Sequence, residues 1–171
     1  ALADAGLIPT ATVPSLEHVA RQFAVAVTPE IADLIAQDAP DDPIARQYLP
    51  DPAELQILPS ELSDPIGDDT HSPIPGIVHR YPDRVLLKPV HICPVYCRFC
   101  FRREAVGPTG AGTLNESELQ DALAYIENHP AIWEVIITGG DPLILSSQRL
   151  AAIAARLNEI PHVKTMRIHT R

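Results

Sequence analysis

The second half of the chain alternates short apolar runs with amphipathic segments, and this alternation restricts the possible folds more than any other feature of the sequence. Residues 84–90, 133–138 and 163–170 are apolar or β-branched runs that predict strands. Residues 115–129 and 146–160 place apolar side chains at the i, i+3, i+4 and i+7 spacing of one helix face. The order strand, helix, strand, helix, strand predicts a βαβαβ unit, and therefore an α/β fold with a parallel sheet and right-handed crossovers.

Two chemically unusual loops follow predicted strands. All three cysteines lie in the loop after the strand at 84–90, and Gly139 and Gly140 begin the loop after the strand at 133–138. The carboxyl ends of parallel strands meet at one edge of a sheet, where α/β proteins bind their ligands. We therefore expect the two loops to converge on one face.

The first half of the chain is acidic and rich in proline. Residues 1–75 hold 13 acidic and two basic side chains and 11 of the 18 prolines, whereas residues 76–171 hold nine acidic and eleven basic side chains. We expect an acidic, Pro-rich N-terminal helical arm over 1–75, with short helices at 15–27 and 28–37, followed by the βαβαβ core over 76–171. Prolines exclude long regular elements over 38–75, so this part is predicted to run extended against a larger body; a disordered acidic linker is the alternative.

The overall charge excludes one broad class of function. The net charge of −9 argues against a general nucleic-acid binder, because such proteins need a basic surface for phosphate contacts. The sequence has neither an apolar run of about 18 residues nor a charged and then apolar leader. A soluble, cytoplasmic protein without membrane contact is therefore expected.

Cys93, Cys97 and Cys100 are the only cysteines of the chain, and they form a C-x3-C-x2-C pattern. An odd number of closely spaced cysteines without a secretory leader argues against a disulfide. Structural zinc is an alternative, with His91 as the fourth ligand, and inert buried thiols are another. An iron–sulfur cluster explains the pattern better, because thiolates are its usual ligands and three of them leave one iron of a four-iron cluster open to a small molecule.

This pattern resembles that of the radical S-adenosylmethionine (SAM) superfamily, in which an aromatic residue precedes the third cysteine, as Phe99 does in "CRFC". The resemblance implies a [4Fe–4S] cluster held by Cys93, Cys97 and Cys100, with SAM on the open iron. It also places Phe99 among the cofactor-binding residues. In that superfamily, reduction of the cluster cleaves SAM to a 5′-deoxyadenosyl radical.

A second motif, "ITGGDPL", follows the next predicted strand. Two glycines let the backbone approach a ligand closely and tolerate positive φ. An ordinary tight turn between strand and helix is the alternative. In radical SAM enzymes a Gly-Gly-acid motif at this place contacts the amino group of SAM, so the resemblance assigns Gly139, Gly140 and Asp141 to cofactor binding.

Further stretches resemble one branch of the superfamily, the lysine 2,3-aminomutase family. They include "HSPIPGIVHRYPDRVLL", "CRFCFRRE" and "IPHVKTMRIHTR", and the resemblance covers residues 38–171. Members of this family are isomerases that use a [4Fe–4S] cluster, SAM and pyridoxal 5′-phosphate (PLP) for the 1,2-migration of an amino group on L-lysine or a related amino acid. The implied fold for residues 76–171 is the N-terminal part of a partial (β/α) barrel of radical SAM type.

The resemblance also assigns ligands to single positions. Arg80 and Tyr81 stand where the family binds the PLP phosphate, and a guanidinium with a phenol suits that anion. Arg102 stands where the family binds the carboxylate of the substrate. His169 and Arg171 stand at a strand end with contacts on the SAM side, and a structural role is the alternative for this histidine.

The family implies partners and parts beyond these residues. The partners are an amino-acid substrate, an electron donor such as flavodoxin or ferredoxin, and further copies of the chain in a homo-oligomer of the full-length form. The family's PLP-anchoring lysine and the acids for the substrate ammonium lie further along than this chain extends. Three strands cannot close a barrel, and the chain lacks an initial methionine and ends with its third predicted strand. We therefore expect a fragment that does not turn over alone.

Three alternatives stay open. Phe99 and Phe101 resemble the relative that isomerises lysine for elongation factor P modification as much as the enzyme for free lysine. A zinc-binding interaction module on the three cysteines and His91 is the alternative from another class. A radical SAM enzyme without PLP is the third.

Overall fold

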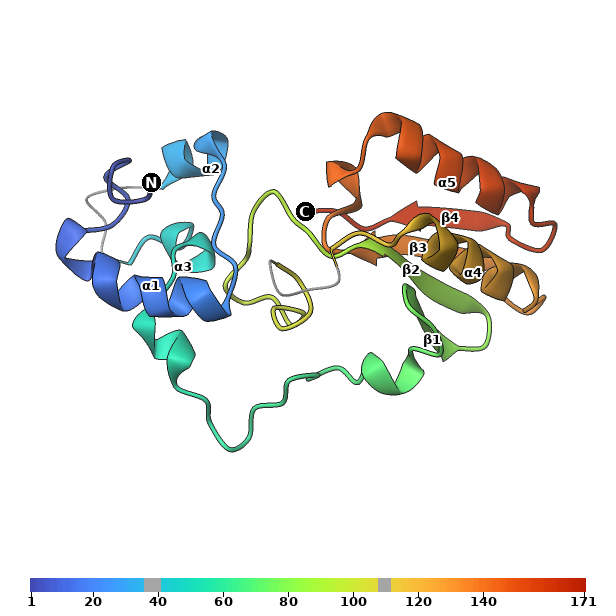
Figure 1. Ribbon diagram of the computed structural model, residues 1–171, viewed down its shortest axis with the longest axis horizontal. Coiled ribbons are helices and arrows are strands. Elements are labelled where there is room, and N and C mark those ends of the chain that lie inside the picture. The colour runs from blue at the N-terminus through green and yellow to red at the C-terminus, as the bar shows by residue number, and fades with distance from the viewer. Residues whose placement is uncertain (36–40, 108–111) are drawn as a thin grey trace. The chain divides into compact units, whose positions relative to one another are not determined.

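The computed structural model of the protein has two compact units (Figure 1). The residues that it describes are 1–35, 41–107 and 112–171. One unit, here called the N-terminal unit, comprises Ala1–Pro65 and Pro94–Gly107, and the other, the sheet unit, comprises Ile66–Cys93 and Pro108–Arg171. The chain therefore passes from one unit to the other within the cysteine loop. The compositional boundary between residues 75 and 76 stays a prediction.

Short helices make up the regular part of the N-terminal unit. They are α1 (Val13–Gln22), α2 (Pro29–Leu34), α3 (Ala45–Tyr48) and the 3₁₀ turns η1 (Thr10–Thr12) and η2 (Pro52–Leu55). The helices predicted at 15–27 and 28–37 exist but are shorter, because Phe23 and Ile35 adopt extended dihedral angles. Residues 36–40, which include the end of the second predicted helix, lie outside the described residues.

The proline-rich stretch of this unit contains no long element in its described part. Between residues 41 and 65, α3 and η2 have four residues each. Proline removes a backbone donor and clashes with the preceding helical turn, so short elements are what the composition predicts. The description of residues 1–75 as an arm stays a prediction.

The sheet unit carries a four-stranded sheet in the order β1-β2-β3-β4. Its elements are β1 (Ile77–Tyr81), β2 (Arg84–Val90), β3 (Glu134–Gly139), β4 (Thr165–Ile168), α4 (Glu116–Glu127), α5 (Ser147–Glu159) and the 3₁₀ turns η3 (Asp69–His71) and η4 (Pro142–Ile144). Strands β2, β3 and β4 are parallel, which confirms the predicted βαβαβ order. Strand β1 was not predicted; it pairs antiparallel with β2 across Pro82 and Asp83, a loop without the Asn-Gly or Gly of common two-residue hairpins, so the sheet is mixed.

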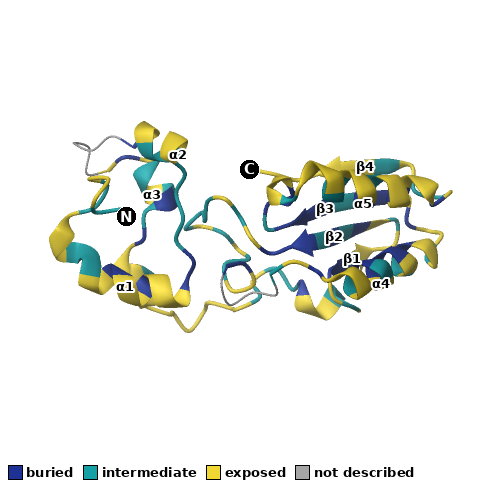
Figure 2. Cartoon of the chain, turned by 45° about the horizontal axis from the view of Figure 1, so that its top comes forward, coloured by how far each residue is buried: buried dark blue, intermediate teal, exposed yellow. Residues whose placement is uncertain are grey.

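Both α4 and α5 pack against the same face of the sheet (Figure 2). Leu123 of α4 and Ile153 of α5 belong to one buried core together with Leu87 and Ile137, which are paired neighbours on β2 and β3. Side chains alternate between the two faces of a strand, and the sheet residues of this core all share one face. The fold is therefore a mixed α/β arrangement with its helices on one side of the sheet.

Capping residues fix where the two long helices begin. The Asn115 side chain accepts from the backbone N–H of Glu118 at 2.9 Å, and Glu118 accepts from the N–H of Asn115 at 2.8 Å, which is a capping box. Ser146 accepts from the N–H of Arg149 at 3.2 Å. The longer helix, α5, has 13 residues, and no helix in the described ranges is long and apolar enough to cross a membrane.

The hairpin between β1 and β2 makes stability depend on pH. Arg84 lowers the pKa of Asp83 from 3.8 to about 2, because its Nε and Nη2 each donate to a carboxylate oxygen at 3.0 Å. The indole Nε1 of Trp133 donates to the same carboxylate at 3.2 Å. The folded pKa lies below the unfolded one, so this contribution to stability is present above the unfolded value and is lost as pH falls towards about 2.

We expect Asp83→Asn to flatten this part of the pH dependence. Urea unfolding of the wild type and the variant should differ near neutral pH and converge as the pH falls through the range between 3.8 and about 2. The effect is modest because both side chains are partly exposed. A constant difference between the two proteins across this range would contradict the assignment.

Candidate functional site

The cysteine loop divides between the two units. Cys93 ends the first part of the sheet unit, and Cys97 and Cys100 belong to the N-terminal unit. All three are half-buried thiols, and a turn bond from the N–H of Cys100 to the carbonyl of Cys97 measures 3.1 Å. In the described residues, no three His, Cys, Asp or Glu side chains are gathered as ligands of one metal ion. Three thiols within eight positions are chemically suited to an iron–sulfur cluster, whose usual ligands are thiolates. The assignment of these cysteines as cluster ligands stays a prediction.

The Gly-Gly turn lies against the start of the cysteine loop. The N–H of Gly140 donates to the carbonyl of Val90 at 2.7 Å, and the N–H of Asp141 donates to the carbonyl of Ile92 at 3.0 Å. Ile92 directly precedes Cys93. The prediction that the two loops converge is therefore confirmed for the part of the cysteine loop that belongs to the sheet unit.

The two glycines are required by this close approach. Gly139 has φ of +114°, and a Cβ there would lie 2.3 Å from the carbonyl oxygen of Val90. A Cβ on Gly140 would lie 2.4 Å from the carbonyl oxygen of Ile92. No other residue fits either position without moving backbone. The contacts thus explain both glycines by the turn alone, and their role in SAM binding stays a proposal.

Asp141 is buried and its carboxylate already has partners. Oδ1 accepts from the N–H of Leu143 at 3.0 Å, which caps η4, and from the hydroxyl of Thr170 at 2.7 Å. Thr170 thereby ties the residues after β4 to the Gly-Gly turn. Thr170 is not among the residues predicted from the sequence; its one signal there is a hydroxyl at the end of a predicted strand, at the edge where the loops meet.

His169 and Arg171, the neighbours of Thr170, are the residues predicted to lie on the SAM side. The N–H of His169 donates to the carbonyl of Ile137 at 2.9 Å, which extends the pairing of β3 and β4. The side chains of His169 and Arg171 are exposed. His169 thus lies at the same edge as Gly139 and Asp141, and a contact with SAM stays a prediction for both residues.

Arg80 and Tyr81, the predicted phosphate ligands, have separate surroundings. Nη2 of Arg80 donates to the carbonyl of Ile66 and lies 3.5 Å from Oδ1 of Asp68. Nζ of Lys88 lies 3.9 Å from the other oxygen of Asp68. Tyr81 is 57% exposed. The carboxylate of Asp68 therefore forms ion pairs with both nearby cations, and the assignment of Arg80 and Tyr81 to a phosphate stays a prediction.

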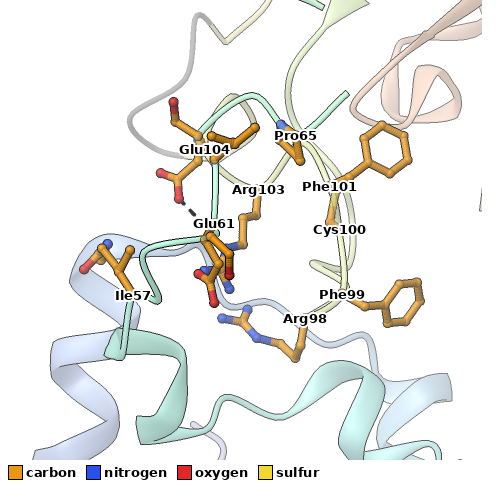
Figure 3. A pocket seen from close by; sticks show the side chains of 13 residues that line it. Ile57, Glu61, Pro65, Arg98, Phe99, Cys100, Phe101, Arg103 and Glu104 are labelled. Atoms are coloured by element: carbon orange, nitrogen blue, oxygen red, sulfur yellow. Dashed lines mark ion pairs between the residues drawn. The ribbon is translucent and has the colours of Figure 1, made fainter. Parts of the chain in front are cut away.

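The residues around Cys100 line a pocket of about 690 Å³ in the N-terminal unit (Figure 3). Phe99 and Phe101 are 59% and 49% exposed, and their rings point away from Arg98 and Arg103 (Figure 3). The guanidinium of Arg102 lies 4.6 Å from the ring centroid of Phe101, a cation–π contact. The predicted roles of Phe99 towards the cofactor and of Arg102 towards a carboxylate stay predictions.

The sequence matches a known family over the part that contains both motifs. Residues 83–170 match the family described as a 4Fe-4S single cluster domain. The chain belongs to this family. Its resemblance to the lysine 2,3-aminomutase family of the radical SAM superfamily is also confirmed by the curated proteins that it matches.

Three of these relatives are enzymes from different bacteria. The chain is 40% identical over 151 residues to the L-lysine 2,3-aminomutase of Clostridium subterminale, which covers 88% of this chain and 36% of that protein. It is 41% identical over 145 residues to the L-lysine 2,3-aminomutase of Bacillus subtilis (strain 168), covering 85% and 31%. It is 39% identical over 149 residues to that of Escherichia coli (strain K12), covering 87% and 43%. The chain thus spans about a third to two fifths of the length of these relatives.

Proposed function

We propose that this chain carries the cluster-binding and SAM-binding part of a radical SAM aminomutase acting on L-lysine or a related amino acid. Cys93, Cys97 and Cys100 would hold a [4Fe–4S] cluster, with one iron open to SAM. When bound, the cluster and SAM supply a 5′-deoxyadenosyl radical that abstracts a hydrogen atom from the substrate. An electron donor such as flavodoxin or ferredoxin belongs to the same proposal, because the cluster has to be reduced first.

One observation carries this proposal more than the others. The turn at Gly139 and Gly140 is hydrogen-bonded to Val90 and Ile92, so the second motif lies beside the residue that precedes Cys93. Thr170 brings the end of β4 to the same place through Asp141. Ligands of α/β proteins bind at this edge of the sheet. The ends of three consecutive parallel strands are therefore joined beside Cys93, the first residue of the cluster motif.

The finer fold prediction belongs to the same proposal. Helices α4 and α5 lie on one face of a sheet whose parallel strands follow chain order. Doubly wound sheets have helices on both faces, whereas barrels have them on the outer face alone. This arrangement supports a partial (β/α) barrel.

Anaerobic reconstitution with iron and sulfide tests the proposal. We expect a brown protein with broad visible absorbance that bleaches with dithionite, and a change in the electron paramagnetic resonance spectrum of the reduced cluster when SAM is added. A colourless protein that retains stoichiometric zinc under the same conditions would contradict it and favour the zinc-binding alternative.

PLP dependence is proposed from the resemblance to the lysine 2,3-aminomutase family. The structure places Asp68 against Arg80 and Lys88, so an incoming phosphate would compete with a carboxylate for Arg80. If Arg80 nevertheless binds the phosphate, removing the competing charge of Asp68 should strengthen that binding.

Titration with PLP tests whether Arg80 binds the phosphate. We expect Asp68→Asn to tighten and Arg80→Ala to weaken the binding of PLP, each about fivefold. Pyridoxal without its phosphate is the control ligand, and its binding should respond to neither substitution. PLP binding that is indifferent to Arg80→Ala would contradict the assignment of this arginine.

A further inference from the structure

The side chain of Arg98, between the second and third cysteines, is held inside the N-terminal unit. Its Nε and Nη2 donate to the two carboxylate oxygens of Glu54 at 3.0 and 2.6 Å. Its Nη1 donates to the carbonyl of Ala24 at 2.7 Å. The side chains of Arg98 and Glu54 are only 9% and 11% exposed. A two-point ion pair with this burial holds an arginine in one orientation.

Glu54 is itself fixed by its own surroundings. Its Oε1 accepts from the backbone N–H of Asp51 at 2.9 Å, as part of the capping box at the start of η2. Its Oε2 lies 3.8 Å from Nη1 of Arg103, and the guanidinium of Arg103 lies 4.1 Å from the ring centroid of Phe23. The carboxylate of Glu54, which accepts both hydrogen bonds from Arg98, is therefore positioned by contacts that do not involve the cysteines.

Backbone bonds hold the same segment on either side of Cys97. The N–H of Tyr96 donates to the carbonyl of Ala26 at 3.1 Å, and the N–H of Arg98 donates to the carbonyl of Gln47 at 2.7 Å. Ala26 follows α1, and Gln47 lies in α3. The segment that carries Cys97 and Cys100 is thus held by the residues after α1, by α3 and by Glu54 in η2, which lie far from it in the sequence.

We propose that the buried Glu54–Arg98 pair positions Cys97 and Cys100 before a cluster binds. This inference rests on the proposed function. A loop that is already ordered loses less conformational entropy when its thiolates are fixed by iron, so the pair lowers the cost of holding the cluster. Glu54 and Arg98 are positioning residues, because they act through the cysteine segment.

Hydrogen exchange in the cluster-free protein tests the positioning directly. We expect Glu54→Gln to speed exchange at the amides of Tyr96 and Arg98 about tenfold or more, because it leaves the buried Arg98 without its counter-charge. The matched control is Glu134→Gln, which removes the charge of another buried carboxylate, one that forms ion pairs with the exposed Arg84 and Arg167 in the sheet unit. The control should leave exchange at Tyr96 and Arg98 unchanged.

A milder variant separates positioning from loss of the fold. Arg98→Lys keeps the charge but cannot make the two-point bond, so it should produce the same local change with less loss of stability. Exchange in α1 (Val13–Gln22) serves as the internal reference and should stay as in the wild type. Faster exchange that spreads equally through α1, or unchanged exchange at Tyr96 and Arg98, would overturn the proposal.

The reconstituted protein gives the second readout. We expect Glu54→Gln and Arg98→Lys to lose the cluster to a chelator about tenfold faster than the wild type and Glu134→Gln. Equal rates of loss in all four proteins would overturn the positioning role. If the wild type takes up no cluster, the proposed function fails, while the exchange experiment still decides whether the pair holds the segment.

Discussion

Cys97→Ala is expected to abolish the cluster while leaving a folded protein. A [4Fe–4S] cluster is held by thiolates, and this chain offers three cysteines, so removal of one leaves two ligands for four irons. Cys97 is half-buried and forms no disulfide, so truncation to alanine should change the free energy of unfolding by only about 1 kcal/mol. Iron and sulfide per chain after anaerobic reconstitution measure the loss, together with the visible absorbance that dithionite bleaches.

The neighbouring residues supply the controls for this result. Cys93→Ala and Cys100→Ala should give the same loss, because each removes one of the three thiolates. Val95→Ala shortens a half-buried side chain of the same loop without touching a thiol, and it should retain wild-type iron. Unchanged iron content in Cys97→Ala would contradict the ligand assignment, and equal loss in Val95→Ala would attribute the effect to the folding of the loop.

The regular part of the sheet unit was predictable because its signals are local. The run 84–90 coincides with β2, and the predicted helices at 115–129 and 146–160 contain α4 and α5 within two residues at each end. Asn115 and Ser146 end the preceding loops with capping side chains, which mark a helix start in the sequence itself. Periodicity and caps act over a few residues, and a single sequence contains them in full.

The features that were missed depend on distant partners. Strand β1 forms because Ile77 and Val78 pair with β2, and its turn lacks the usual glycine signal. Arg98 lies 44 positions from Glu54, and no local pattern links an arginine in a cysteine loop to an acid in a proline-rich stretch. Thr170 is 29 positions from Asp141. Such contacts follow from how the elements pack, which spacing along the chain does not specify.

Gly140→Ala is expected to destabilise the sheet unit strongly. The added Cβ would lie 2.4 Å from the carbonyl oxygen and 2.6 Å from the backbone nitrogen of Ile92, so backbone has to move. Forced movement of packed backbone costs about 1 to 3 kcal/mol. The displaced strand end is the one that leads into Cys93, so the cluster should also be retained less well. Urea unfolding and iron content of the reconstituted protein measure the two effects.

Two other glycines separate the steric cost of an added Cβ from the cost of a left-handed backbone. Gly112 has φ of +65° and nothing within 4 Å of a Cβ, so Gly112→Ala isolates the cost of a left-handed backbone, about 1 to 2 kcal/mol. Gly139 combines φ of +114° with a Cβ contact of 2.3 Å to Val90, so Gly139→Ala should cost more than either of the other variants. If Gly140→Ala is no worse than Gly112→Ala, the close approach of the turn to Ile92 is not what requires the glycine. If Gly140→Ala reduces iron content by more than its loss of stability explains, the Gly-Gly turn positions the cysteine loop as well as the fold.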